Sequence, residues 1–251
     1  MNKKSLFLLM GTLGIVVAAF RLYSNKPQQL TTPQTTTMAT PYSRSSWFTN
    51  AFIIGNDLMP QMIGEVFVPL RNRISSSYPI PELRDRFNAA LQDPMMTFSL
   101  ASRKSDVHGK GLKGEGPLAF SGPSPSGDVP AAIFIAENFR RRIILAYGAF
   151  SNQEAERYLE DLFLAVYLHE YYHIKKQNLW RLSLSNSEIV DSEKDCWAYT
   201  CKDILIPMQN GGRGKLIPGT QEHAILSVYL QVGGDTDSAV WNSLMRKLYE
   251  K

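Results

Sequence analysis

Residues 151–177 read SNQEAERYLEDLFLAVYLHEYYHIKKQ, and this stretch decides the fold of the chain. Ser151 and Glu154 form the S-x-x-E pattern of a capping box, which marks the start of a helix. Apolar residues then recur at helical spacing without Gly or Pro, so we expect one long helix that runs to about Gln177.

The expected helix carries the pattern H-E-x-x-H. A spacing of four places the imidazoles of His169 and His173 on one face, one turn apart, where they can share a tetrahedral metal ion. Both continue the apolar stripe of Leu162 and Val166, so they face the interior. Glu170 is rotated by about 100° from His169 and flanks the metal, where it can take a proton from metal-bound water. The pattern therefore predicts a Zn²⁺ site with Glu170 as the catalytic general base.

A second capping box supplies the remaining ligands. Ser185 and Glu188 predict a helix that runs to about Ile206, where Pro207 is expected to stop it. A catalytic zinc site takes three protein ligands and leaves the fourth position to water. The second helix is rich in carboxylates, so we expect the third ligand here.

These two helices resemble those of the gluzincins, the thermolysin-type metallopeptidases, over residues 150–207. The run Asp195-Cys196-Trp197-Ala198 is close to the A-D-C-x-A element of bacterial neutral zinc metallopeptidases. The run from Ile204 to Pro207 is similar to the L-L-x-P ending of the same helix in ImmA/IrrE-type metallopeptidases. The resemblance implies zinc-dependent hydrolysis of a peptide or protein substrate and a zincin-like fold.

The third ligand has two candidates. Aligning Asp195 with the Asp of the family pattern puts Asp191 at the position of the ligand Glu, with Asp195 in support. Glu193 lies 19 residues beyond His173, which is a thermolysin-like gap, and falls on the apolar face of its helix. A carboxylate on such a face needs a partner. Asp191 and Glu193 both remain candidates.

A hydrolase of this kind also needs a donor for the developing oxyanion. His223, Tyr229 and Tyr199 lie downstream of the metal helices, where gluzincins place such a group. An ordinary surface or core role is open to each, and His223 is the candidate catalytic residue among them.

The expected fold is α+β and zincin-like, with a small sheet packed on the H-E-x-x-H helix and a mainly helical C-terminal half. Segments 58–75 and 81–92 have helical spacing, and 103–130 is expected to be mostly loop. Gly211–Gly214 reads as a mobile loop, and Thr220 and Asp235 as N-caps of two closing helices. Strand-like composition is found at Met95–Ala101, Ala131–Ala136 and Arg142–Tyr147. The last two are the expected sheet, with Ala131–Ala136 as an edge strand that would align an extended peptide.

The N-terminus predicts a membrane anchor. Residues 1–23 contain an uncharged apolar run, Leu6–Phe20, after two lysines, and are expected to be a signal anchor or a signal peptide. Residues 24–46 are rich in Thr, Pro, Gln and Ser and read as a disordered linker to a domain at 47–251. The positive-inside bias favours an anchored domain on the extracytoplasmic side, either periplasmic or extracellular.

Charge and cysteine content exclude other classes. The first 50 residues hold five of the 27 Lys and Arg residues and no acidic residue, so the remainder is close to neutral, which speaks against nucleic-acid binding. Cys196 and Cys201 lie five residues apart in the expected helix. Their Cα atoms would then be roughly 8–9 Å apart, which is too far for a disulfide. Two further functions stay open: a tethered binding module with structural zinc or none, and zinc-dependent hydrolysis of a non-peptide amide.

Overall fold

The computed structural model describes residues 66–100, 117–123, 130–136, 138–177 and 184–250. All of these belong to one compact unit, Tyr42–Lys251. They form an α+β fold in which helices predominate and a single small sheet is described. The expected anchor and linker at 1–46 lie outside this part of the chain. No helix within it is long and apolar enough to cross a membrane.

The sheet has three strands in the order β1-β3-β2. β1 (Met96–Leu100) pairs in parallel with β3 (Ala131–Ile135), and β2 (Ala119–Pro123) pairs with β3 in antiparallel. The strands expected near residues 95 and 131 are therefore confirmed. The expectation that Ala131–Ala136 forms an edge is wrong, because β3 is the central strand. β2 lies in the segment 103–130, which was expected to be mostly loop. Gly and Pro at the end of this five-residue strand are typical of loops, so its sequence does not indicate a strand.

The third expected strand is instead a helix. The segment Arg142–Tyr147 lies inside α6 (Asn138–Ala149). Its buried residues are Phe139, Arg142, Ile143 and Ala146. This spacing of three and four residues is helical, so the β-branched run within it gave the wrong impression of a strand.

Two helices precede the sheet and confirm the expected helical spacing there. α4 (Val68–Ser77) ends two residues beyond the expected end at 75, and residues 58–65 lie outside the description. α5 (Pro81–Leu91) matches the expected helix 81–92, with Pro81 in its first turn, where a missing N–H costs nothing.

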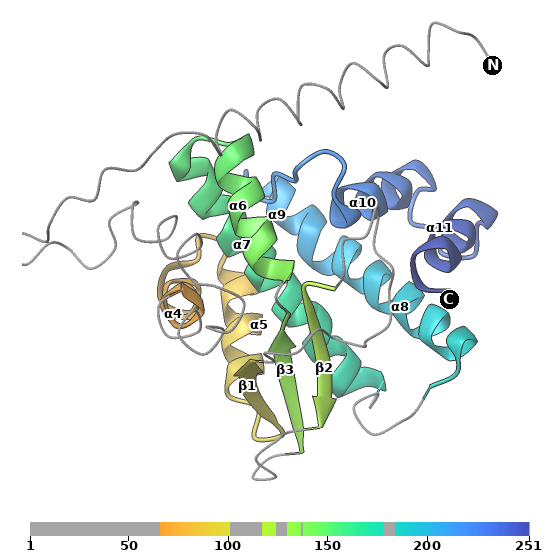
Figure 1. The fold of residues 1–251 in the computed structure, drawn as a ribbon, viewed down its shortest axis with the longest axis horizontal. Coiled ribbons are helices and arrows are strands. Elements are labelled where there is room, and N and C mark those ends of the chain that lie inside the picture. Colours follow the sequence, from red (N-terminus) through yellow and green to blue (C-terminus); the bar gives the residue numbers. More distant parts are fainter. Residues whose placement is uncertain (1–65, 101–116, 124–129, 137, 178–183, 251) are drawn as a thin grey trace, which may run out of the picture. The chain divides into compact units, whose positions relative to one another are not determined.

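α7 (Asn152–Tyr172) is the central helix of the fold, and Figure 1 shows it behind the sheet. Both parts of the Ser151–Glu154 capping box are formed. The helix is buried over most of its circumference, as expected for a helix enclosed by neighbours. The Phe163 ring contacts those of Phe67, Phe87 and Phe139, with centroids 5.7 to 6.2 Å apart. α7 then continues as a π-helical turn, His173–Gln177, so the expected end at Gln177 is confirmed.

The second helix that starts at a capping box is longer than expected. α8 (Asn186–Thr200) starts at a complete capping box of Ser185 and Glu188. It passes through a π-helical turn (Cys201–Leu205) into α9 (Ile206–Asn210). Pro207 therefore does not stop the helix. The wider π turn brings Pro207 into the first turn of a new helical segment, where its missing N–H is tolerated.

Two short helices close the chain, α10 (Gln221–Gln231) and α11 (Ala239–Tyr249). Thr220 is the N-cap residue of α10 as expected, although its hydroxyl donates to the Ile217 carbonyl. The N-cap of α11 is Ser238, whose Oγ accepts from the Trp241 N–H. The expectation for Asp235 is wrong, because its carboxylate instead accepts from the Asp237 N–H within a turn.

The Gly-rich loop is anchored to α7, contrary to the expectation of a mobile segment. The Asp161 carboxylate accepts from Arg213 Nε at 2.9 Å and from the Gly214 N–H at 2.8 Å. Gly214 has φ of +68°, and a Cβ there would lie 2.8 Å from the Met208 Cβ. Only glycine fits this close approach.

Candidate metal centre

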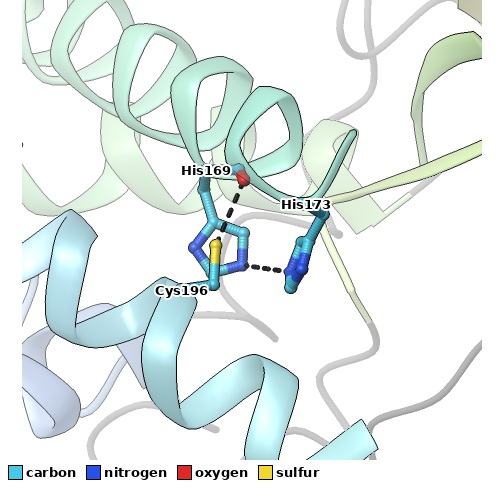
Figure 2. A group of neighbouring side chains, drawn as sticks. All are labelled: His169, His173 and Cys196. Atoms are coloured by element: carbon cyan, nitrogen blue, oxygen red, sulfur yellow. Dashed lines mark hydrogen bonds between the residues drawn. The ribbon is translucent and has the colours of Figure 1, made fainter. Parts of the chain in front are cut away.

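The C-terminal end of α7 brings the two histidines of the H-E-x-x-H pattern together. His169 Nε2 lies 3.2 Å from His173 Nε2, and both side chains are buried. Figure 2 shows the two rings extending from the same helix towards α8, with His173 at the start of the π-helical turn. The spacing of four residues has therefore produced the shared face that the sequence predicts.

Thr200 on α8 fixes the tautomer of His169. Its hydroxyl donates to the Cys196 carbonyl at 2.8 Å, which leaves its lone pairs to accept from His169 Nδ1 at 2.9 Å. A neutral His169 must then carry its proton on Nδ1 and its lone pair on Nε2. This is the form in which Nε2 can bind a metal.

Gln177 and Ser192 together fix the tautomer of His173. Gln177 Nε2 donates to the Ser192 carbonyl at 3.0 Å, and Ser192 Oγ donates to Gln177 Oε1 at 2.7 Å. These two bonds turn Gln177 Oε1 towards His173 Nδ1, 2.7 Å away. His173 therefore also presents the lone pair of Nε2 to the space between the rings.

Glu193 completes this cluster from α8. Its carboxylate oxygens lie 3.4 Å from His169 Nε2 and 3.5 Å from His173 Nε2. Oε2 is buried and has no hydrogen-bond partner within the described part of the chain. Two nitrogen lone pairs and a carboxylate thus converge on one small volume, which can only be stable with a cation, either a proton or a metal ion.

The pKa values of His169 and Glu193 in the metal-free cluster reflect the need for a cation. Burial alone would lower the pKa of His169, but Cys196 and Glu193 beside it raise it to about 10. Burial alone would raise the pKa of Glu193, but the two histidines hold it well below its usual range. The cluster therefore attracts positive charge, and a metal ion can replace the protons.

The donor distances fit a tetrahedral ion. Zn–N bonds of about 2.0–2.1 Å and Zn–O bonds of about 2.0–2.2 Å give ligand–ligand separations of roughly 3.3–3.5 Å at tetrahedral angles. The two nitrogens lie 3.2 Å apart, and Glu193 approaches His169 Nε2 with Oε2 at 3.4 Å and His173 Nε2 with Oε1 at 3.5 Å. These distances are close to those around a tetrahedral ion, so the buried cluster could hold a metal ion.

Cys196 is a second potential ligand on α8, one turn beyond Glu193. Its Sγ and one nitrogen of each histidine all lie within 4.8 Å of one another, and all three residues are buried (Figure 2). In the metal-free cluster the thiol donates to the His169 carbonyl at 3.2 Å. Both cysteines are free, as their spacing predicts.

The structure separates the two candidate third ligands. Glu193 faces the histidines, whereas Asp191 and Asp195 are solvent-exposed on other faces of α8. The pairing of Asp191 with Asp195, taken from the family alignment, therefore does not form here. The departure has a simple cause: a helix turns by about 100° per residue, so a shift of two positions points the carboxylate away from the metal face.

Glu170 is buried beside the cluster and faces β2 as well. Its pKa is raised, chiefly because the carboxyl is removed from water and because Glu193 is near, while the histidines and a hydrogen bond from Ser121 oppose this. A carboxylate with a raised pKa is a better proton acceptor at neutral pH. Its position and its basicity suit the role of a general base.

The expected oxyanion donors do not join the site. His223 lies in the first turn of α10, and no interaction recorded for the described residues links it to the cluster. Tyr199 stacks on Tyr172, with ring centroids 4.4 Å apart, and Tyr229 packs edge-on against Trp241. Tyr199 and Tyr229 therefore have the ordinary packing roles that the sequence also allowed.

Sequence reasoning missed the residues that orient the ligands. Thr200 lies seven residues after Glu193, so the helical repeat already puts both on one face of α8. Gln177 follows His173 by four residues, which likewise puts both on one face, whereas Ser192 has no comparable signal because its contact with Gln177 depends on how the helices pack. A comparison of the chain with family models, with curated proteins and with solved structures finds no match to any of them.

Proposed function

We propose that this domain is a zinc-dependent peptidase in which His169, His173 and Glu193 bind the metal and Glu170 is the general base. The observation that carries the proposal is the convergence of two oriented imidazole nitrogens and the Glu193 carboxylate, whose buried Oε2 has no hydrogen-bond partner among the described residues. Two histidines and one glutamate leave a fourth position open, which distinguishes a catalytic site from a structural one.

Each part of the proposed site has its own role in hydrolysis. Bound Zn²⁺ would supply Lewis acidity, which polarises a carbonyl group and makes water more acidic. The Glu170 carboxylate accepts the proton of the attacking water and passes it to the departing amine. Ser121 on β2 holds that carboxylate by a hydrogen bond and so keeps it aimed at the reacting atoms. Peptides as the substrate class are supported by the resemblance to gluzincins alone.

A second candidate function is a binding module with a structural metal. Cys196 favours it, because the thiolate could join His169, His173 and Glu193 and close the site with four protein ligands. The two candidates predict different effects of single substitutions on metal binding. Hydrolysis of a non-peptide amide would use the same site and would be separated by substrate alone.

The first test is metal stoichiometry. The protein should bind about one zinc per chain, and Glu193→Gln should weaken binding far more than Cys196→Ala. A reversed order of these two variants would favour the structural site, and a folded protein without zinc after incubation with the metal would contradict both candidates.

The second test is Glu170→Gln. This variant should keep the metal and the fold but lose hydrolysis of a peptide library by roughly 100-fold or more, because the amide cannot accept a proton. Glu156→Gln on the same helix is the matched control and should leave activity unchanged. Near-normal turnover in the Glu170 variant would contradict the assigned role.

A further inference from the structure

A tyrosine at the end of α11 lies where α8, α10 and α11 meet. The Tyr249 hydroxyl oxygen accepts a hydrogen bond from Trp197 Nε1 at 2.6 Å and another from Gln221 Nε2 at 2.7 Å. The residue is only 7% exposed. The phenol oxygen is therefore held in place by donors from two different helices.

In this arrangement the Tyr249 hydroxyl can act further only as a hydrogen-bond donor. A phenol has one O–H donor and accepts through its lone pairs. The indole N–H and the Gln221 amide N–H both donate to it, so the Tyr249 proton points away from these two groups. Within the described ranges, no acceptor for that proton is found. A buried donor without an acceptor is costly, and in a native protein such a group calls for an explanation, of which a catalytic role is one.

The surroundings of the hydroxyl are those of the metal centre. The Trp197 ring that donates to it lies against His169, with ring centroids 4.6 Å apart. Burial is the first cause that raises the Tyr249 pKa well above its ordinary value, and the negative charge of Glu193 adds to it, whereas the hydrogen bond from Trp197 opposes it. The phenol therefore keeps its proton at neutral pH, and Trp197 links it to the His169 ring.

We propose that the Tyr249 O–H stabilises the negative charge that develops on the substrate carbonyl oxygen during hydrolysis. This inference rests on the proposed peptidase function and adds a catalytic residue to it. Trp197 and Gln221 act as positioning residues, because they orient the hydroxyl before substrate binds. A donor fixed in advance stabilises a transition state more than one that must reorganise.

The experiment compares a tetrahedral with a planar ligand on the full-length zinc-loaded protein. The tetrahedral probe is a capped phosphinic pseudodipeptide of Ala-Ala, which mimics the charged transition state. The planar probe is acetohydroxamate, which binds zinc without that geometry. Binding to wild type, Tyr249→Phe and the control Tyr229→Phe is measured by calorimetry, together with zinc content.

The expected result is a selective loss. Tyr249→Phe should keep its zinc and its affinity for acetohydroxamate, but should bind the phosphinic probe roughly 100-fold more weakly. On any peptide that wild type cleaves, kcat should fall while KM stays the same. Tyr229→Phe should resemble wild type in every measurement. Equal affinity of wild type and Tyr249→Phe for the phosphinic probe would overturn the role of Tyr249 and leave the proposed function intact.

Two further outcomes are decisive. A wild-type protein that holds zinc but binds neither probe would overturn the peptidase proposal, and the role of Tyr249 with it. If Tyr249→Phe loses its zinc or its fold, the variant Gln221→Met tests the role of the Tyr249 hydroxyl instead. It keeps the phenol but removes one of the two donors that orient it. That variant should bind the phosphinic probe several-fold more weakly, and unchanged binding would overturn the inference.

Discussion

At the scale of the residue, Thr200 shows how much of the centre depends on groups that never touch the metal. Its hydroxyl is committed as a donor to the Cys196 carbonyl and can only accept from His169 Nδ1. The orientation of the His169 ring and the choice of its tautomer both follow from this one side chain. Metal affinity should therefore respond to its removal, although Thr200 is not a ligand.

The corresponding prediction is that Thr200→Val lowers zinc affinity by about 10–100-fold, because His169 Nδ1–H loses its acceptor. Thr220→Val is the matched control, since Thr220 is equally buried but donates to the Ile217 carbonyl at the start of α10. Competition with a chelating dye measures both affinities. Equal affinities for the two variants would show that the tautomer of His169 is fixed by something else.

At the scale of the element, the capping box of α7 ties the stability of the metal helix to pH. Glu154 accepts hydrogen bonds from the Ser151 hydroxyl, at 2.7 Å, and from Lys215, at 3.0 Å. The Ser151 hydroxyl, Lys215 and the Ser151 N–H lower its pKa from 4.5 to about 2. A pKa that is lower in the folded state stabilises the fold above pH 4.5, and this contribution is lost as pH falls towards 2.

Glu154→Gln should therefore lower the melting temperature at pH 7, while the difference from wild type should shrink steadily below pH 4.5. Glu156→Gln, two residues further along α7, serves as the control and should show no such dependence. Thermal unfolding followed by circular dichroism over this pH range measures the effect. A difference that persists unchanged at pH 2 would contradict the role of the charge.

At the scale of the whole molecule, a metal ion bound by the proposed ligands would link two helices that contact each other. The proposed ligands come from α7, from its π-helical continuation and from α8, so an ion that binds only the folded state should stabilise the entire domain. At a free zinc concentration 100 times the Kd, the gain is about 2.7 kcal/mol. For a domain of this size, that corresponds to an increase in Tm of roughly 5–11 °C.

Calorimetric scans with zinc and with excess chelator should show this difference in Tm. His169→Ala should remove the response to zinc and so provides the control. An identical Tm for the wild-type protein under both conditions would mean that the cluster does not hold the ion tightly.

The N-terminal segment carries the last prediction at this scale. Its apolar run and linker lie outside the described residues, so the expectation of a single-pass protein with an extracytoplasmic domain still rests on the sequence. Fractionation and protease accessibility of intact spheroplasts or microsomes will test it. Full-length protein in the soluble cytoplasmic fraction would contradict the anchor, and protection from added protease until lysis would reverse the orientation.

The sequence by itself determined the elements that have a local cause. Capping boxes at Ser151 and Ser185 predicted the start of both metal helices, because the box is formed by residues within one turn. The H-E-x-x-H spacing predicted that His169 and His173 share a face, since the helical repeat alone dictates it. Errors arose where local signals were ambiguous, as in the β-branched run of α6 and at Pro207.

The tertiary structure decided everything that depends on how α7 packs against its neighbours. Only the approach of α8 selects Glu193 over Asp191, since both are carboxylates on one helix and differ in the direction they face. The order of strands in the sheet depends likewise on pairing between distant segments, which no local pattern encodes. Tyr249 lies 52 residues from Trp197, and its hydroxyl is oriented only when α8, α10 and α11 pack together.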